Sequence, residues 1–282
     1  MRWDRGHRSS NVDDRRGASF GGFGGGGRGM PLGTLLMLGS RFGIKGILVA
    51  LVLGALMFGT GICGGGGLTT CMGGGAPSQR ATQDQPVQST PKEDELASFV
   101  GFVLDDVQTS FDRQLDRYQP TRLTLFRGAV QSACGSASAA VGPFYCPLDK
   151  KVYIDLGFYD ELHRRFGAPG DFAQAYVIAH EVGHHVQNLH GLLGRGEVHQ
   201  IEVELQADCL AGAWAKDADA RGLVEVGDVD EALGAAAAIG DDTIQRKTQG
   251  HVQPETWTHG SAAQRSSAFK KGLQGGARAC GL

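Results

Sequence analysis

The chain has 282 residues, which is enough for one large domain with additional segments. Residues 1–45 carry eight Lys or Arg and three acidic residues, residues 46–76 carry no charge, and residues 77–282 hold the other 19 basic and 27 acidic residues. An acidic body behind a basic start argues against nucleic acid as a partner.

Residues 1–41 are rich in Gly, Arg and Ser and show no apolar periodicity, so we expect a disordered basic head. The uncharged run Gly46–Ile62 has 17 residues and would span about 26 Å as a helix. Because Lys45 can snorkel, a transmembrane helix is expected over residues 42–62. The basic residues precede this run, so the positive-inside rule predicts a cytoplasmic N-terminus and a folded domain on the periplasmic or extracellular side of the cell membrane.

A cleaved signal peptide is the alternative interpretation of this run. Its charged n-region would occupy the first 45 residues, whereas whole signal peptides have only about 15–30 residues. We therefore expect an uncleaved, single-pass anchor.

A flexible linker is predicted over residues 63–92, and the folded domain is expected over residues 93–282. Apolar residues at helical spacing predict a helix that starts near Glu93 and ends before Pro120. Further helices are predicted over residues 156–166, 173–189, 197–219, 228–245 and 261–273.

Two strands are predicted, over Leu123–Phe126 and Lys151–Asp155, with a loop rich in Gly, Ser and Ala between them. The domain is therefore expected to belong to the α+β class and to be mostly helical with a small sheet.

The six cysteines indicate an oxidising compartment, although six cysteines allow fifteen connectivities. Local spacing favours a disulfide between Cys134 and Cys146. A Cys209–Cys280 bridge would then tie the end of the chain to the domain. Cys63 and Cys71 form the remaining pair.

Residues 180–190, HEVGHHVQNLH, hold four histidines and a glutamate in a strongly helical segment. His180 and His184 are four residues apart, so both imidazoles lie on one helix face and can reach one ion. Glu181 projects about 100° around the helix from His180, where it can contact a water beside the ion but is poorly placed to bind the ion itself. In this His-Glu-x-x-His arrangement two histidines bind zinc and the glutamate acts as a general base. The apolar residues YVIA before the motif indicate a buried helix, where an unpaired polar cluster would be costly.

His190 is a misleading candidate for the third ligand. It lies six residues after His184, as the third histidine of metzincins does, but that pattern needs a glycine where this chain has Gln187. On an unbroken helix His190 points about 120° away from His184.

Glu204 is the better candidate, because it lies on a second apolar helix twenty residues beyond His184. Asp208 follows at i+4 on the same face and could accept a hydrogen bond from a ligating imidazole. Glu197 and Glu202 are the alternatives.

His-Glu-x-x-His on one helix with Glu-x-x-x-Asp on the next resembles the gluzincin pattern of integral-membrane endopeptidases. In that group a later histidine, followed six residues on by an arginine, lines the active site. His259 and Arg265 in HGSAAQR match this spacing. The resemblance implies that His259 is catalytic and that Arg265 supports the metal site. The proline that follows this histidine in the group is replaced by Gly260 here, so the match to the group's motif is incomplete at this position.

More specifically, the chain resembles the bacterial neutral zinc metallopeptidase family. The resemblance rests on MRWDRGHRSSNVDDRRG, GPFYCPLDKKVYIDLGFYDEL, AHEVGHHVQ, ELQADCLAGAWA and THGSAAQR, which span nearly the whole chain. It implies a zincin-like fold and zinc peptidase activity.

The resulting hypothesis is a zinc-dependent peptidase, more specifically an endopeptidase, that acts on peptide or protein substrates. Zn²⁺ would be held by the two motif histidines and Glu204, Glu181 would act as the base, and His259 would stabilise the oxyanion. Lys151–Asp155 could pair with an extended substrate as an edge strand. The alternatives are an inactive zinc-binding, membrane-anchored scaffold and a binding module whose motif is accidental. The sequence specifies no oligomeric state.

Overall fold

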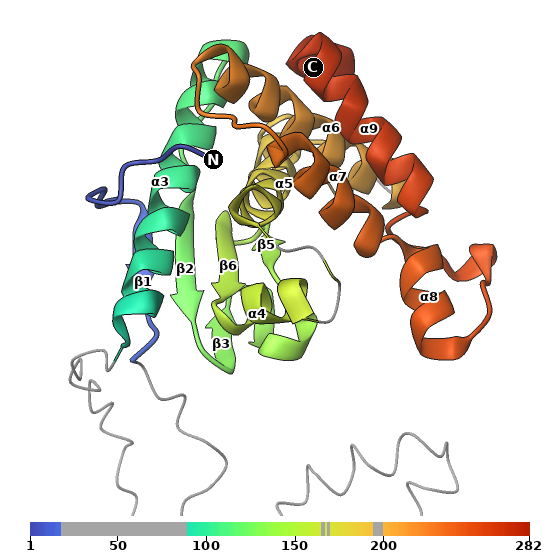
Figure 1. Cartoon of the computed structure of the whole chain (residues 1–282), viewed down its shortest axis with the longest axis horizontal. Helices are drawn as coiled ribbons and strands as arrows, with labels where there is room; N and C mark the ends of the chain where they lie inside the picture. The colour runs from blue at the N-terminus through green and yellow to red at the C-terminus, as the bar shows by residue number, and fades with distance from the viewer. Residues whose placement is uncertain (18–88, 165–166, 168–169, 194–199) are drawn as a thin grey trace, which may run out of the picture. The chain divides into compact units, whose positions relative to one another are not determined.

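The computed structural model describes residues 1–17, 89–164, 167, 170–193 and 200–282 (Figure 1). The strands are β1 (Val12–Asp14), β2 (Arg122–Phe126), β3 (Ala129–Ser132), β4 (Gly135–Ser138), β5 (Phe144–Cys146) and β6 (Lys151–Asp155). The α-helices are α3 (Pro91–Gln114), α4 (Gly157–Arg164), α5 (Asp171–Leu189), α6 (Gln200–Ala220), α7 (Asp228–Ala238), α8 (Asp241–Gln249) and α9 (Ala262–Gly275), and the 3₁₀ turns are η1 (Ala139–Val141), η2 (Pro254–Thr256) and η3 (Ala277–Cys280). The expected mixed and mostly helical class is confirmed.

The main sheet has the strand order β1-β2-β6-β5, in which β1, β2 and β6 are parallel and β5 is antiparallel to β6. The prediction that Lys151–Asp155 is an edge strand is therefore wrong. β6 is hydrogen-bonded on both sides, and β5 forms the edge of the described sheet on the side away from β1. The sequence missed β5 because a three-residue strand is too short to show an alternating pattern.

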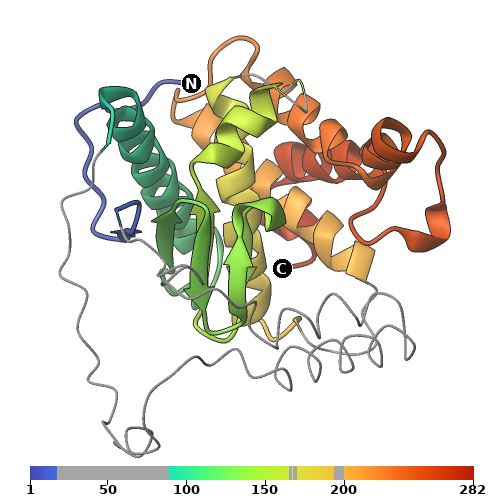
Figure 2. The same cartoon turned by 90° about the horizontal axis from the view of Figure 1, so that it is seen from below.

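Helix α5 is the central element of the domain, with the sheet on one side and α6, α7 and α9 on the other (Figures 1 and 2). It contacts helices α3, α6 and α7 and strands β5 and β6. Its sequence explains this position, because apolar residues occur on almost all of its faces. Fully buried examples are Phe172, Ala175, Tyr176, Ile178, Ala179 and Val182. A helix that is apolar all round is stable only inside a protein.

Helices α6 and α9 pack closely because glycines lie at their crossing. A Cβ atom at Gly272 would clash with the carbonyl oxygen of Cys209, and one at Gly212 would clash with the carbonyl oxygen of Phe269. The disulfide Cys209–Cys280 closes the same contact from the end of the chain. This bridge confirms one of the two expected disulfide pairs.

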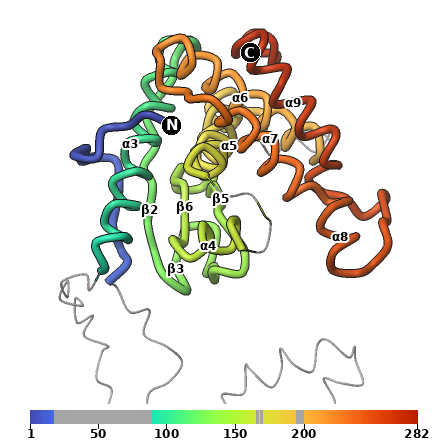
Figure 3. Tube along the Cα trace, viewed as in Figure 1, coloured from blue at the N-terminus to red at the C-terminus, as the bar shows by residue number. Residues whose placement is uncertain are grey.

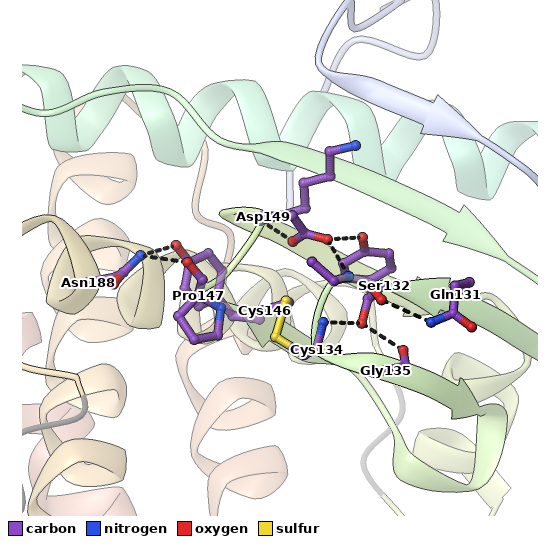
Figure 4. Close-up of a disulfide and its surroundings, with 12 residues drawn as sticks. Gln131, Ser132, Cys134, Gly135, Cys146, Pro147, Asp149 and Asn188 are labelled. Atoms are coloured by element: carbon purple, nitrogen blue, oxygen red, sulfur yellow. Dashed lines mark hydrogen bonds between the residues drawn. A yellow bond between two sulfur atoms is a disulfide. The ribbon is translucent and has the colours of Figure 1, made fainter.

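The other expected pair, Cys134–Cys146, is also present and joins the turn between β3 and β4 to the end of β5 (Figure 4). Asn188 of α5 donates hydrogen bonds from Nδ2 to the hydroxyl of Tyr145 at 2.9 Å and to the carbonyl of Pro147 at 3.4 Å. The bridge and these bonds hold the edge strand against α5.

The helix predicted over residues 228–245 is two helices, α7 and α8, separated at Gly240. A Cβ atom at Gly240 would clash with the backbone of Ala262 at the start of α9. The chain therefore turns at Gly240, where it passes close to the start of α9. Ile239 and Gly240 lie outside both helices, and α8 points away from the body of the domain (Figure 1).

Disorder was predicted for residues 1–41, and for residues 1–17 this is wrong. Strand β1 joins the main sheet, and the N-terminal segment runs beside α3 (Figure 3). The Gly-rich average over residues 1–41 concealed a segment whose Trp3 and Val12 pack against the core. The rest of the head, the predicted span over residues 42–62 and the linker up to residue 88 lie outside the described residues.

The domain begins slightly earlier than predicted, because α3 starts at Pro91 with Thr90 as its cap. The helices of the described ranges include none that is both long and apolar enough to cross a membrane.

The α6–α9 crossing predicts opposite effects for two helical Gly→Ala changes. Gly272→Ala should destabilise the protein by about 1–3 kcal/mol, because the added methyl group cannot be accommodated at the crossing. Gly234→Ala in α7 meets no atom within 4 Å and should stabilise it by up to about 1 kcal/mol through helix propensity. Urea unfolding of both variants measures this difference, and equal midpoints would contradict the described crossing.

Candidate metal centre

Helices α5 and α6 bring three potential ligands together. The Nε2 atom of His180 lies 3.3 Å from Glu204 Oε2, and Nε2 of His184 lies 3.6 Å from Glu204 Oε1. One ligand atom from each residue lies within 4.8 Å of the others. The structure thus places Glu204 opposite both histidines of the motif.

The helices can approach because of Gly183, which lies between the two histidines on α5. A Cβ atom there would lie 3.2 Å from both the Cα and the carbonyl oxygen of Ala207 on α6. Any larger residue at position 183 would push α6, and Glu204 with it, away from the histidines. This contact explains why α5 has a glycine in its interior, although glycine costs about 1 kcal/mol relative to alanine there.

The spacing of these donors fits zinc. Tetrahedral zinc with nitrogen and oxygen ligands at about 2.0–2.1 Å requires donor atoms about 3.3 Å apart. The two histidine–carboxylate distances, 3.3 and 3.6 Å, are close to that value. Two imidazoles and one carboxylate are also a donor set of catalytic zinc sites.

The orientation of His180 is fixed by a buried charge network. Its Nδ1 donates to Asp208 Oδ1 at 2.9 Å, and Asp208 also accepts two hydrogen bonds from Arg265, at 2.8 and 2.9 Å, and one from the hydroxyl of Tyr176. The exposed fractions of Asp208 and Arg265 are 0% and 2%. The sequence predicted Asp208 and Arg265 in supporting positions, but nothing in it singled out Tyr176.

The pKa values reflect this network. Burial would raise the pKa of Asp208, but the charges of Arg265 and His180 hold it well below its usual range. Burial would also lower the pKa of His180, yet Asp208 and Glu204 raise it to about 10. For Glu204, the His180 hydrogen bond and the charge of His184 overcome burial and lower the pKa to about 2. Without an ion, the negative carboxylates hold a proton on His180, which a metal would have to displace.

His184 is oriented by Gln187, a residue to which the sequence gave no role in the site. The side-chain oxygen of Gln187 lies 2.8 Å from Nδ1 of His184, and its amide group donates to the carbonyl of Val203 at 2.7 Å and to Gln206 at 3.0 Å. Gln187 is fully buried. The residue that argued against a metzincin site therefore links His184 to α6.

His180, His184 and Glu204 line a cavity. Glu181 lines it too, but it is outside the group of candidate ligands. Glu181 is 7% exposed, and burial raises the pKa of its carboxyl group, although His184 and His180 act in the opposite direction. A carboxylate with a raised pKa beside a metal centre is well suited to accept a proton.

His259 lines this cavity from the other side, and Asp241 holds it there. The Nδ1 atom of His259 lies 3.3 Å from Asp241 Oδ1 and 2.9 Å from the hydroxyl of Thr258. Asp241 Oδ2 also accepts backbone N–H bonds from Thr258, His259 and Gly260, at 2.8, 2.7 and 3.0 Å. The sequence gave no signal for Asp241, because the helix predicted over residues 228–245 runs through it.

The remaining ligand candidates lie elsewhere. His190 caps the end of α5 and is exposed, and Glu202 is exposed on α6, so neither belongs to the group around His180. Glu197 lies outside the described residues. Nε2 of His185 donates to the carbonyl of Gln119 at 2.7 Å, and its Nδ1 lies 3.0 Å from the hydroxyl of Tyr145, so this histidine links α5 to neighbouring segments.

A second group of carboxylates, Asp171, Asp228 and Glu231, is close enough to hold a cation. The α-amino group of Met1 lies 2.6 Å from Asp171 and 3.4 Å from Asp228. An ammonium group therefore already lies against two of these three carboxylates.

A buried His-Glu-x-x-His helix faced by a glutamate from the following helix is the donor arrangement of zinc metallopeptidases. A model of the family described as "Putative neutral zinc metallopeptidase" matches residues 1–281. The chain belongs to this family.

The relatives found are themselves without a described function. The uncharacterized protein YpfJ of Escherichia coli K12 is 42% identical over 294 residues, which covers 98% of this chain and 96% of the relative. The uncharacterized protein Rv2575 of Mycobacterium tuberculosis H37Rv is 48% identical over 180 residues, 57% of this chain and 61% of the relative. No solved structure matches the chain.

The geometry predicts which substitutions weaken zinc binding. Glu204→Gln should lower zinc affinity by roughly a hundredfold or more, because a charged ligand is replaced by a neutral amide. Glu202→Gln on the same helix and His190→Ala should leave affinity unchanged. Titration against a competing chelator measures all three. A loss of zinc in His190→Ala with retention in Glu204→Gln would refute the ligand assignment.

Proposed function

We propose that this protein is a zinc peptidase with a zincin-like fold and that His180, His184 and Glu204 are its zinc ligands. The observation that carries the proposal is the group of two imidazoles and one carboxylate, with side chains 8–14% exposed, and Glu181 beside it. Bound zinc would supply Lewis-acid polarisation of a carbonyl and a lowered pKa for water. An inactive zinc scaffold, the second candidate, would have no use for a buried carboxylate with a raised pKa next to the ligands.

Glu181 then moves the protons of the reaction. It accepts a proton from the water that attacks the peptide carbonyl and passes it to the nitrogen of the leaving amine. His259 can donate a hydrogen bond to the oxygen on which negative charge develops. In the tautomer in which Nδ1 accepts from the Thr258 hydroxyl, 2.9 Å away, the ring proton is on Nε2 and is available for this contact.

Strand β5 is the place where an extended substrate can bind. It forms the edge of the described sheet away from β1, and its residues Phe144 and Tyr145 line the cavity that contains Glu181 and the proposed ligands. A peptide added to this edge would form backbone hydrogen bonds with β5 and lie across the metal centre.

The cavity of about 450 Å³ has apolar walls on both sides of the centre. Val141, Phe144 and Phe158 line it from the sheet side, and Ile239 and Ile244 line it from the α7–α8 side. Its charged lining residues, within the described part of the chain, belong to the proposed centre or to the Asp208–Arg265 pair. No other charge is left there to bind a peptide terminus, which supports an endopeptidase that prefers apolar side chains.

The two disulfides support an oxidising compartment for this domain. Attachment to the membrane through residues 42–62 is part of the proposal and rests on the sequence alone.

Glu181→Gln should keep zinc and lose peptidase activity by about 10²–10⁴-fold, because an amide of nearly the same shape cannot accept a proton. Glu161→Gln, an exposed change on α4, is the matched control and should keep full activity. Zinc content and hydrolysis of a quenched fluorescent peptide mixture are measured on the same preparations. Wild-type turnover in Glu181→Gln would remove Glu181 from the role of base.

Ile244→Glu should change substrate preference. A charge on the α8 wall should lower kcat/KM for peptides with Leu near the scissile bond by roughly tenfold or more and raise it for matched peptides with Lys. Gln249→Glu, exposed at the end of the same helix, should not change the ratio. Unchanged Leu-to-Lys ratios in both variants would show that α8 does not contact the substrate.

A further inference from the structure

The N-terminal segment is built into the domain that carries the metal centre. Strand β1 pairs in parallel with β2, with Val12 opposite Leu123 and Asp14 opposite Leu125. Earlier in the segment, the ring of Trp3 packs against those of Phe99 and Phe102 on α3, with centroids 5.3 and 6.3 Å apart. Both backbone and side chains therefore connect this segment to the rest of the domain.

Asp105 of α3 is the main polar anchor of the segment. It lies 2.8 Å from Nε2 of His7 and accepts hydrogen bonds from Ser9 at 2.9 Å and Asn11 at 2.8 Å. The segment lies directly on the helix, since a Cβ atom at Gly101 would come within 3.0 Å of Ser9. Three side chains that converge on one carboxylate specify a single docking position.

Arg16 fixes the other end of the segment. Its guanidinium is buried and bonds to Asp14, to the carbonyl of Glu93 at 3.1 Å and to Asp94 at 3.2 Å. Burying a guanidinium is unfavourable unless it is paired, so breaking these contacts while Arg16 stays buried would carry a large free-energy cost.

These contacts conflict with a single membrane crossing between the segment and the domain. Hydrogen-bonded strands lie about 4.8 Å apart, whereas the hydrocarbon core of a bilayer is about 30 Å thick. If Gly46–Ile62 crossed the membrane once, as its sequence suggests, β1 and β2 would be on opposite sides and could not pair. The first five arginines of the head, up to Arg16, and the two disulfides of the domain belong to one folded unit, although the sequence assigns them to different compartments.

We propose that residues 1–16 and residues 90–282 lie on the same side of the cell membrane, with β1 docked, whatever path the residues between them take. This inference is independent of the peptidase proposal, because it uses none of the residues of the metal centre. The sequence alone predicted a cytoplasmic head and a domain outside the membrane. The proposal instead places both in one compartment.

Cysteine labelling in cells tests the proposal on the full-length chain. Arg5→Cys in the head and Arg246→Cys in α8 are introduced separately into a Cys63→Ser, Cys71→Ser background, since both arginine side chains are largely exposed. A membrane-impermeant maleimide is applied to cells with an intact cytoplasmic membrane and again after permeabilisation, with the background chain as the control. Labelling of both sites before permeabilisation, or of both only afterwards, supports the proposal. Labelling of one site before and the other only after overturns it.

A second measurement tests the docking itself. A site-specific protease sequence replaces residues 79–85, the solubilised protein is cut, and the C-terminal part is captured by a tag. The N-terminal fragment should remain bound, and its retention should fall in Asp105→Ala but not in Asp112→Ala, an exposed change on the same helix. Release of the N-terminal fragment from the unsubstituted protein would also overturn the proposal.

Discussion

The buried carboxylate of Asp208 is the interaction around which the domain is arranged. It accepts hydrogen bonds from Tyr176 and His180 of α5 and from Arg265 of α9, and it belongs to α6 itself. A carboxylate buried without partners costs several kcal/mol, so the donors from α5 and α9 offset the cost of burying Asp208 between these three helices. The same hydrogen bonds set the direction of the His180 ring. The hydrogen bonds that join these helices therefore also orient His180, a candidate metal ligand.

Helix α6 contributes to both the helix packing and the candidate metal centre because α5 and α9 approach it closely at small residues. Gly183 of α5 meets Ala207, while Gly272 of α9 meets the backbone at Cys209. Asp208 lies between these two contacts in the sequence, and the Cys209–Cys280 bridge secures the second contact. A displacement of α6 would disturb the Glu204 carboxylate, the Asp208 network and the disulfide together. This coupling explains why a region with no direct role in chemistry, the end of the chain, is tied so close to the centre.

The sequence predicted the parts of the site whose geometry one helix determines. The spacing of His180 and His184 follows from the helical repeat. Gln187 was missed because its partners, apart from His184, are backbone and side-chain groups of α6, and a buried polar residue on a helix has no pattern that names a distant partner. The strand predictions were confirmed, but strand order depends on pairings between distant segments, so β6 was wrongly placed at an edge. The ordered start of the chain was missed because its strand is three residues long and its stabilising contacts are with segments far away in the sequence, among them α3, β2 and Leu223.

Asp241 positions both parts of the cavity wall to which we assigned functions: His259, the proposed donor to the oxyanion, and Ile244, the proposed apolar contact. It begins α8, and it accepts the backbone N–H groups of Thr258, His259 and Gly260 where the chain returns from the projecting segment. Its own N–H donates to the carbonyl of Gly260 at 2.9 Å. The segment from residue 241 to residue 260 is thus closed at its base by the Asp241 side chain and this backbone bond, and Asp242 adds a bond from the Ala262 N–H at 2.8 Å. His259 lies at that base and Ile244 lies one turn into α8, so the position of the oxyanion donor and that of the apolar wall depend on the same carboxylate. Any movement of α8 that admits a substrate must keep this base intact if His259 is to stay in the cavity.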